Sequence, residues 1–327
     1  MPSRILYFPY INVPSSAWLM RMLLYWDEVG TIAPLEYLQN PKHFDAVTLD
    51  LVKRNLITPI IPGYHLEDFP EFSSRFVEFI GSLPVQTIDD RRNNFVNDQK
   101  SVVTVHYQKL EDLGEVLVSK GLASRKDGSW YFVERKTSEE FMAYLAAILS
   151  FKSRKKYTPM TDSSVELDYV FNSSSSRAES KLRPIRYEFL NDIFPLPMGT
   201  LSPRQIDEFK TKHYDKLRSL RRAIEQRVLE IASIVDDDLR RHASKEFSAQ
   251  IQDDVNELRN EMKRQLGKGA TTLGRICFTV AAKLSKTVGI TKAILGTIPD
   301  GPEKHSGPLL YAAYAQSELS LDAGSEK

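Results

Sequence analysis

The sequence predicts an α+β or α/β protein, with a mixed N-terminal domain followed by a helical hairpin and an amphipathic helix. Two observations predict this class. Up to about residue 150, short apolar runs alternate with segments of helical spacing, which is typical of helices layered on a sheet. Beyond residue 202, apolar residues recur every three or four positions among charged ones, which indicates long helices. We expect domains at 1–195, 196–298 and 299–327.

The first domain is expected to open with a strand and a helix. Ile5 to Ile11 is an apolar and aromatic run bounded by proline, which predicts a buried strand. Ser15 or Ser16 can cap a helix that runs to Trp26. The same alternation then predicts strands at 29–33, 57–61 and 102–107 and helices at 44–54, 69–80 and 113–120, the last ended by Gly121.

A hairpin and a strong helix are expected next. Asp127-Gly128 is a turn signal, and Trp130 to Glu134 forms the returning strand. Thr137 or Ser138 can cap a helix that continues to Phe151. The following segment, 152–183, is basic, rich in serine and poor in apolar residues, so we expect a mobile loop there.

The C-terminal part is expected to be helical. Ser202 with Pro203 is a helix start, and an apolar stripe continues to Ile231. Three aspartates at 236–238 interrupt the pattern before a second helix that runs to about residue 266, so an antiparallel hairpin is expected. After Pro299 we expect a linker, an apolar patch at 309–314 that docks on the core, and a frayed end.

Composition excludes several classes of protein. The 327 residues contain 44 Lys and Arg against 43 Asp and Glu, so any electrostatic partner must meet a local patch. The single cysteine, Cys277, excludes an internal disulfide framework and CxxC metal sites. The N-terminus lacks the pattern of a signal peptide, and no apolar run is long enough for a transmembrane helix. We therefore expect a cytoplasmic protein, free or peripheral at the inner membrane surface.

The opening ILYFPYINVPSSAWLMRMLLYWDEVGTIAP resembles the start of an uncharacterised family of bacterial proteins, known only as a domain of unknown function. Members of that family begin with a tyrosine-rich strand, a proline and a helix that ends in LLYWD. The block SPRQIDEFKTKHYDKLRSLRRAIE is similar to the charged helix of the same family. The resemblance implies a bacterial origin and brings no assigned active site.

One alternative function is a metal-dependent nuclease. Asp127, Glu134 and Lys136 have the order of a signature in which two carboxylates hold Mg²⁺ and a lysine stabilises the hydroxide or the transition state. Glu134 and Lys136 would share one face if the strand extended that far. Against this, Asp-Gly in a turn is explained by backbone geometry alone.

No other cofactor site is expected. Lys268 in GKGATTLG is followed by Gly269 and preceded by a helix, so the stretch is not a nucleotide-binding phosphate loop. The six histidines are scattered singly, without the spacing of a zinc site. We therefore expect Mg²⁺ as a cofactor only under the nuclease alternative.

The segment Gly267 to Lys292 has the pattern of a basic amphipathic helix. No acidic residue occurs from Met262 to Pro299. An apolar stripe opposes a basic face, and the binding residues we expect on that face and its flank are Lys268, Arg275, Lys283, Lys286 and Lys292. Such a helix can lie on an anionic membrane or pack on the N-terminal layer, and both alternatives stay open.

A second basic group precedes the serine-rich segment. Its residues are Lys152, Arg154, Lys155 and Lys156, and they either neutralise phosphates of a nucleic acid or flank a solvated loop. Taken together, the patterns favour a binding or scaffolding protein rather than an enzyme, one that acts on a protein partner or on itself through the C-terminal helices. The nuclease and a peripheral membrane protein are the alternatives.

Overall fold

The computed structural model describes residues 4–8, 10–14, 17–162, 174–195, 201–266 and 307–319. Helices and strands are both present, which confirms the mixed class. The chain forms two compact units, Met1–Ser180 and Lys181–Lys327. This division falls inside helix α10 (Ser174–Ile193) rather than near residue 195, so most of that helix belongs to the second unit.

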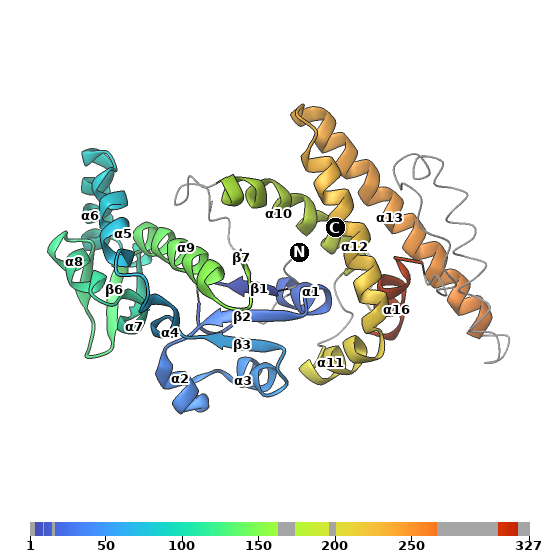
Figure 1. Ribbon diagram of the computed structural model, residues 1–327, viewed down its shortest axis with the longest axis horizontal. Helices are drawn as coiled ribbons and strands as arrows, with labels where there is room; N and C mark the ends of the chain where they lie inside the picture. Colours follow the sequence, from blue (N-terminus) through green and yellow to red (C-terminus); the bar gives the residue numbers. More distant parts are fainter. Residues whose placement is uncertain are drawn as a thin grey trace. The chain divides into compact units, whose positions relative to one another are not determined.

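A parallel sheet organises the first unit. Its strands are β1 (Arg4–Tyr7), β2 (Glu28–Ile32), β3 (Ile57–Ile60) and β7 (Thr158–Met160), in the order β3-β2-β1-β7 (Figure 1). All three pairings are parallel, and the residues opposite each other include Ile5 and Val29. Parallel strands are covered on both faces, which explains their apolar runs. The strands expected at 5–11, 29–33 and 57–61 are confirmed, the first ending already at Tyr7.

The helices that connect these strands are short. They are α1 (Ala17–Tyr25), α2 (Leu35–Gln39), the 3₁₀ turn η1 (Pro41–His43) and α3 (Ala46–Lys53). Asp45 caps α3 by accepting a 2.7 Å hydrogen bond from the N–H of Thr48. The two serines expected to cap α1 lie outside the described residues.

A second group of elements is inserted between β3 and β7. In chain order it contains α4 (Gly63–Leu66), α5 (Phe72–Gly81), α6 (Val85–Asn97), the 3₁₀ turn η2 (Gln99–Ser101), β4 (Val102–His106), α7 (Tyr107–Leu110), α8 (Leu113–Ser119), β5 (Ala123–Arg125), β6 (Trp130–Glu134) and α9 (Arg135–Lys152). The three strands form an antiparallel sheet in the order β4-β6-β5. Gly121 ends α8 at a φ of 70°, as expected for a glycine stop.

Helix α9 is the centre of this insertion. Phe141, Ala143 and Leu145 are fully buried, and Phe72 and Phe76 of α5 pack on Phe141 and Tyr144. A glycine is required nearby, because a Cβ on Gly114 would lie 2.8 Å from the ring of Tyr131. These contacts give the antiparallel sheet and its helices one common core.

The expectation of a mobile loop at 152–183 is wrong for two stretches. Thr158–Met160 forms β7, an edge strand that pairs with β1, and α10 begins at Ser174. Both gain their structure from partners distant in the sequence: β7 from the backbone of β1, and α10 from a core that buries Phe189 and Leu190. Residues 163–173 of the expected loop lie outside the described residues.

The second unit is helical. Besides α10 it contains α11 (Pro203–Lys212), α12 (Tyr214–Ala232), α13 (Asp237–Leu266) and α16 (Leu310–Glu318). Ser202 and Gln205 form a capping box at the start of α11. The expected antiparallel hairpin is confirmed as α12 and α13 (Figure 1), although the first helix is broken at His213 into α11 and α12.

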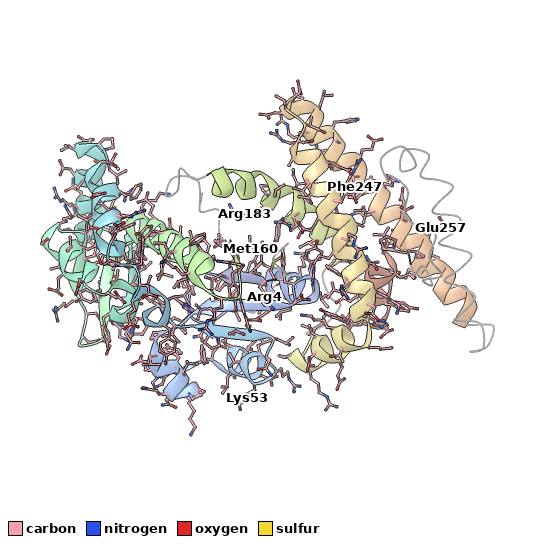
Figure 2. The ribbon with its side chains drawn as sticks, viewed as in Figure 1. Arg4, Lys53, Met160, Arg183, Phe247 and Glu257 are labelled. Atoms are coloured by element: carbon pink, nitrogen blue, oxygen red, sulfur yellow. The ribbon has the colours of Figure 1, made fainter. Side chains whose placement is uncertain are left out.

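The core of this unit follows the expected stripe. Leu217, Leu220 and Ile224 of α12 are buried. The rings of Phe189 and Phe247 pack edge to face with centroids 4.8 Å apart, and Figure 2 labels Phe247 on α13. The patch expected at 309–314 belongs to α16, which packs against α12 and α13 and buries Tyr311. The expectation that this patch docks on a core is therefore confirmed, and the core is that of the second unit.

Candidate functional site

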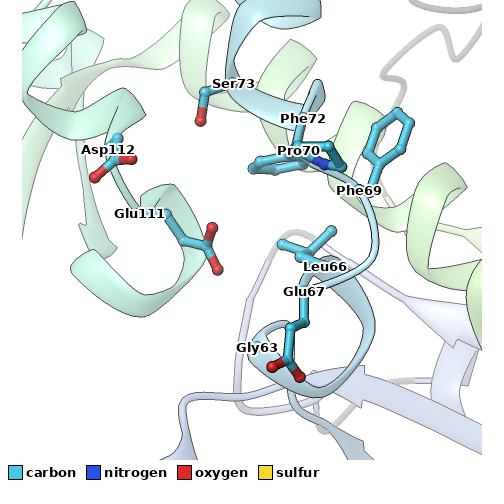
Figure 3. Close-up of a pocket in the computed structure, with 9 residues that line it drawn as sticks. All are labelled: Gly63, Leu66, Glu67, Phe69, Pro70, Phe72, Ser73, Glu111 and Asp112. Atoms are coloured by element: carbon cyan, nitrogen blue, oxygen red, sulfur yellow. The ribbon is translucent and has the colours of Figure 1, made fainter.

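A hollow of about 430 Å³ in the first unit is the site that the described residues favour (Figure 3). Its apolar lining comprises Leu66, Phe69, Pro70 and Phe72, which belong to α4, α5 and the turn between them. Its polar lining comprises Glu67, Ser73, Glu111 and Asp112, and Gly63 completes it. None of these lining residues is basic. The hollow therefore combines apolar surface with three carboxylates.

The apolar wall is rigid because it is part of the core. Leu66 and Phe72 are 4% and 2% exposed, and Phe69 packs partly buried against the same cluster. The chain enters this wall directly from β3, since α4 begins three residues after Ile60. Hydrogen bonds from the N–H of Phe69 to Leu66 O and from the N–H of Phe72 to Phe69 O, at 2.8 and 3.0 Å, hold the turn.

The acidic wall is the link between α7 and α8. Glu111 ends α7 with φ 49° and ψ −132°, a conformation that glycine adopts readily and other residues rarely. Its N–H donates a 2.7 Å hydrogen bond to Tyr107 O, which closes the turn. Backbone strain of this kind is found preferentially at functional sites. Figure 3 shows the side chain of Glu111 extending from this link toward Leu66.

The electrostatics of the hollow favour a cation. Partial burial and the negative charge of Asp112 raise the pKa of the Glu111 carboxyl. A positively charged group near Glu111 would offset both effects and lower that pKa again. A ligand with an apolar stem and a cationic end fits such a lining, since the stem can cover Phe69 and Pro70, which are not fully buried, while the charge meets the carboxylates.

The elements around the hollow have the order and strand pairing of a winged helix–turn–helix unit. A strand (β4), two helices (α7 and α8) and a two-stranded wing (β5 and β6) follow one another, with β6 between β4 and β5. Nucleic-acid binders of this kind carry a basic face. Residues 63–152 instead contain 14 Asp and Glu against 11 Lys and Arg, and Glu115 lies exposed on α8. This segment is therefore weakly acidic overall, and Glu115 is paired with Arg125 of the wing at 2.7 Å.

The three residues of the nuclease alternative are not brought together. Asp127 lies in the turn before β6, where its Oδ1 accepts the N–H groups of Ser129 and Trp130 at 2.9 and 3.0 Å. Glu134 lies at the other end of β6, roughly 13 Å along a strand at 3.3 Å per residue. Its carboxylate caps α9 by accepting the N–H groups of Lys136 and Thr137 at 2.9 and 2.7 Å.

The strand does not extend to Lys136, as the nuclease alternative would require. Helix α9 starts at Arg135, so Lys136 is an exposed helical residue rather than a strand neighbour of Glu134. The cap is Glu134 itself, not Thr137 or Ser138. A carboxylate that satisfies the first N–H groups of a helix is a structural device. In the described part of the chain, no group of three His, Cys, Asp or Glu side chains is arranged to hold a metal ion.

The basic group at 152–156 has local partners. The ammonium group of Lys155 lies 3.0 Å from the carboxylate of Glu28, and that of Lys156 donates a 2.6 Å hydrogen bond to Phe151 O. Lys152 lies over the ring of Phe69 at 5.4 Å, whereas Arg154 is exposed. The expected basic face of the C-terminal segment, Lys268, Arg275, Lys283, Lys286 and Lys292, lies outside the described residues.

The carboxyl edge of the parallel sheet offers a further place for a ligand. The chain leaves β1 toward β2 and β3 on one side and returns as β7 on the other, and ligands often bind at such a switch point. The described polar pair there is Tyr7 and Asp162, with 3.3 Å between Tyr7 Oη and Asp162 Oδ1. Burial and the charge of Asp162 raise the pKa of the Tyr7 phenol, which keeps it protonated.

Sequence reasoning missed the hollow entirely. Its lining comes from 63–73 and from 111–112, which only packing brings together. The one local signal was Glu111-Asp112 between two apolar helical segments, and this pattern is common in turns. In the described residues, no helix has the length and hydrophobicity needed to cross a membrane. Comparison of the chain with models of protein families, with curated proteins and with solved structures found no match.

Proposed function

We propose that this chain is a binding protein whose first unit holds a lysine or arginine side chain of a partner protein in the hollow between α4–α5 and α7–α8. The observation that carries the proposal is the pairing of a rigid apolar wall with Glu67, Glu111 and Asp112 and no basic lining residue. The strained backbone of Glu111 supports it. Such strain persists only where the surrounding structure enforces it, and it is found preferentially at functional sites.

A lysine or arginine side chain matches the lining in two respects. Its methylene stem buries apolar surface against the partly exposed Phe69 and Pro70, at roughly 25 cal/mol per Å². Its charge meets carboxylates that have no cation among the lining residues. Arginine can in addition form paired hydrogen bonds with a carboxylate, so we expect arginine to bind more tightly than lysine.

The test uses fluorescent peptides that contain a single central arginine or lysine, with citrulline or norleucine at that position as neutral controls. We expect the charged peptides alone to bind the full chain, and binding to weaken as salt increases. The double variant Glu111→Gln, Asp112→Asn should lose at least tenfold in affinity. Glu78→Gln, an exposed acid on α5 outside the hollow, is the matched control and should leave the affinity unchanged.

The pH dependence follows from Glu111. Because its pKa is raised, its carboxyl gains a proton at a higher pH than an ordinary glutamic acid. Affinity for the arginine peptide should therefore rise with pH through that pKa and level off above it. Equal binding of the citrulline peptide, or an unchanged affinity in the double variant, would sink the proposal.

The expectation that binding uses the C-terminal helices stays a prediction. Its main support, the basic face at 268–292, lies outside the described residues. Association with an anionic membrane depends on the same residues and stays a prediction as well. Neither is required for binding at the hollow.

A further inference from the structure

The contact between α2 and α7 joins the insertion to the part of the chain that forms the parallel sheet. The N–H of Leu35 in α2 donates a 2.7 Å hydrogen bond to Oε1 of Gln108 in α7. One residue further along α2, Oε1 of Glu36 lies 3.2 Å from Nε2 of His106, the residue that precedes α7. His106 is fully buried. The contact therefore has a buried titratable group at its centre.

His106 also caps α7. Its Nδ1 accepts the N–H of Gln108 at 3.2 Å, and its backbone has the extended conformation typical of an N-cap residue. An imidazole nitrogen accepts a hydrogen bond only when it carries no proton, so the hydrogen of the neutral ring is assigned to Nε2. Protonated imidazole carries a hydrogen on both nitrogens. The cap consequently exists only while His106 is neutral.

The surroundings of the His106 ring offer little to a positive charge. Nε2 makes no hydrogen bond among the described residues, because Glu36 lies at ion-pair distance without the alignment of a hydrogen bond. Two aromatic rings enclose the imidazole, with centroid distances of 4.9 Å to Trp130 and 4.8 Å to Tyr107. A protonated ring would lose its hydration here and gain only the attraction of Glu36 in return.

Three charged groups act on His106, from α2, from α7 and from the turn before β6. Burial lowers the pKa of His106 and is the largest effect, and the positive charge of Lys109 on α7 acts in the same direction. Glu36 on α2 and Asp127 in the turn act in the opposite direction. When α7 opens, the exposed imidazole regains its ordinary pKa of about 6.5. The open form therefore binds a proton more readily than the closed form, so acid favours opening.

We propose that His106 is a proton switch that holds α7 against α2 when it is neutral and releases α7 when it is protonated. Protonation turns the capping nitrogen from an acceptor into a donor, so the N–H of Gln108 loses its partner. The same residue holds Leu35 through its side chain, so loss of the cap also loosens the contact with α2. The cap is complete above the ordinary pKa of histidine and is lost as the pH falls below it.

The switch also bears on the hollow. Helix α7 ends at Glu111, which belongs to the acidic wall, so release of α7 would disturb that wall and weaken the binding of a cation. This consequence rests on the function proposed for the hollow. The switch itself does not, because it requires only the contacts of His106 and Gln108.

The test uses NMR of the full chain from pH 4 to pH 8, without any peptide. The ¹⁵N shift of Nδ1 reports protonation of His106, and the hydrogen exchange rate of the Gln108 amide reports the cap. The amide of Lys120, which donates to Val116 O at 3.1 Å, is the reference, because a ratio of two rates cancels the intrinsic effect of pH on exchange. We expect the Gln108 rate to rise at least tenfold relative to Lys120 as His106 gains its proton, with one common midpoint below about 6.5.

Three variants sharpen the test. Glu36→Gln removes a charge that favours protonated His106, so both midpoints should move to lower pH. His106→Asn supplies an oxygen that can cap α7 and does not titrate, so the ratio of rates should no longer depend on pH. His242→Asn changes a histidine on α13 whose side chain is 79% exposed. It is the matched control and should reproduce the wild-type curve.

Each of three outcomes overturns the proposal. The first is a ratio of rates that stays constant while His106 takes up its proton. The second is a His106 ring that remains neutral down to pH 4. The third is an unchanged pH dependence in His106→Asn, which would assign the effect to another group. A hollow that binds no arginine peptide would contradict the proposed function alone, since none of these measurements involves the peptide.

Discussion

Two parts of the insertion treat a buried positive charge in opposite ways. Where α6 packs on α9, Arg91 is 7% exposed and forms two hydrogen bonds with the carboxylate of Glu140, at 2.7 and 2.8 Å. On α7, Lys109 is 3% exposed and has no such partner among the described residues. If either partner of the Arg91–Glu140 pair were removed, the other charge would be left buried and unpaired. The unpaired Lys109 is disfavoured in its charged form, so it costs stability.

The largest expected effect comes from breaking the paired cation. Arg91→Ala leaves the carboxylate of Glu140 buried without its partner, and we expect a loss of about 3–5 kcal/mol in the free energy of unfolding. Denaturant unfolding at pH 7 measures it. The double variant Arg91→Met, Glu140→Leu removes both charges and should recover most of the loss. If Arg91→Ala costs less than 1 kcal/mol, the pair does not hold α6 to α9.

Removing the unpaired cation should have the opposite sign. Lys109→Met replaces a buried amine by an apolar side chain of similar length, so we expect the free energy of unfolding at pH 7 to increase. The gain also depends on pH. The pKa of Lys109 is about 7 in the folded state and about 10.4 in the unfolded state, so between these values only the unfolded state holds the proton. Wild-type stability therefore rises with pH over this range, because the protonated unfolded state becomes less favourable.

Unfolding midpoints measured from pH 6 to 10 test this difference. The variant should lack the rise, so its advantage is largest at or below pH 7 and shrinks toward pH 10. Arg91→Met provides the contrast, since it should be destabilised across the whole range. A wild-type curve that is parallel to that of Lys109→Met would mean that the amine is solvated in the folded protein.

The cap of α9 should give a smaller effect. Glu134→Ala removes the acceptor for two backbone N–H groups and for the hydroxyl of Thr137, and we expect a loss of about 1–2 kcal/mol in stability. Lys136→Ala, on the exposed side of the same helical turn, should change stability by less than about 0.5 kcal/mol. Thermal unfolding distinguishes the two variants, and equal effects would contradict a capping role for Glu134.

The smallest effect is expected at the strained link. Glu111→Gly relieves a φ/ψ combination that costs other residues about 1–3 kcal/mol, and the greater freedom of glycine in the unfolded chain offsets about 0.4–1 kcal/mol of this. We expect a net gain of about 0.5–1 kcal/mol, together with weaker binding of the arginine peptide. A loss of stability would show that the Glu111 side chain, not the backbone, holds the turn.

Much of the first unit followed from local pattern. The apolar strands β1, β2 and β3, the hairpin of β5 and β6, and the helix ended by Gly121 all lie where periodicity and turn residues predict them. The elements that were missed lack such a pattern. Helix α6 is polar and is anchored by the buried Arg91, and β7 is a three-residue strand with a central proline. Both depend on partners far away in the sequence.

Short-range chemistry thus decided the class of the fold, the hairpin of α12 and α13, and the stripe that forms their core, because side-chain period and capping act over a few residues. Tertiary packing decided the roles of individual charged residues. Glu134 became a cap, Arg91 found Glu140, and Lys109 was buried without a counter-ion. Burial and pairing set the energy of a charge, and both depend on neighbours that come from other parts of the chain.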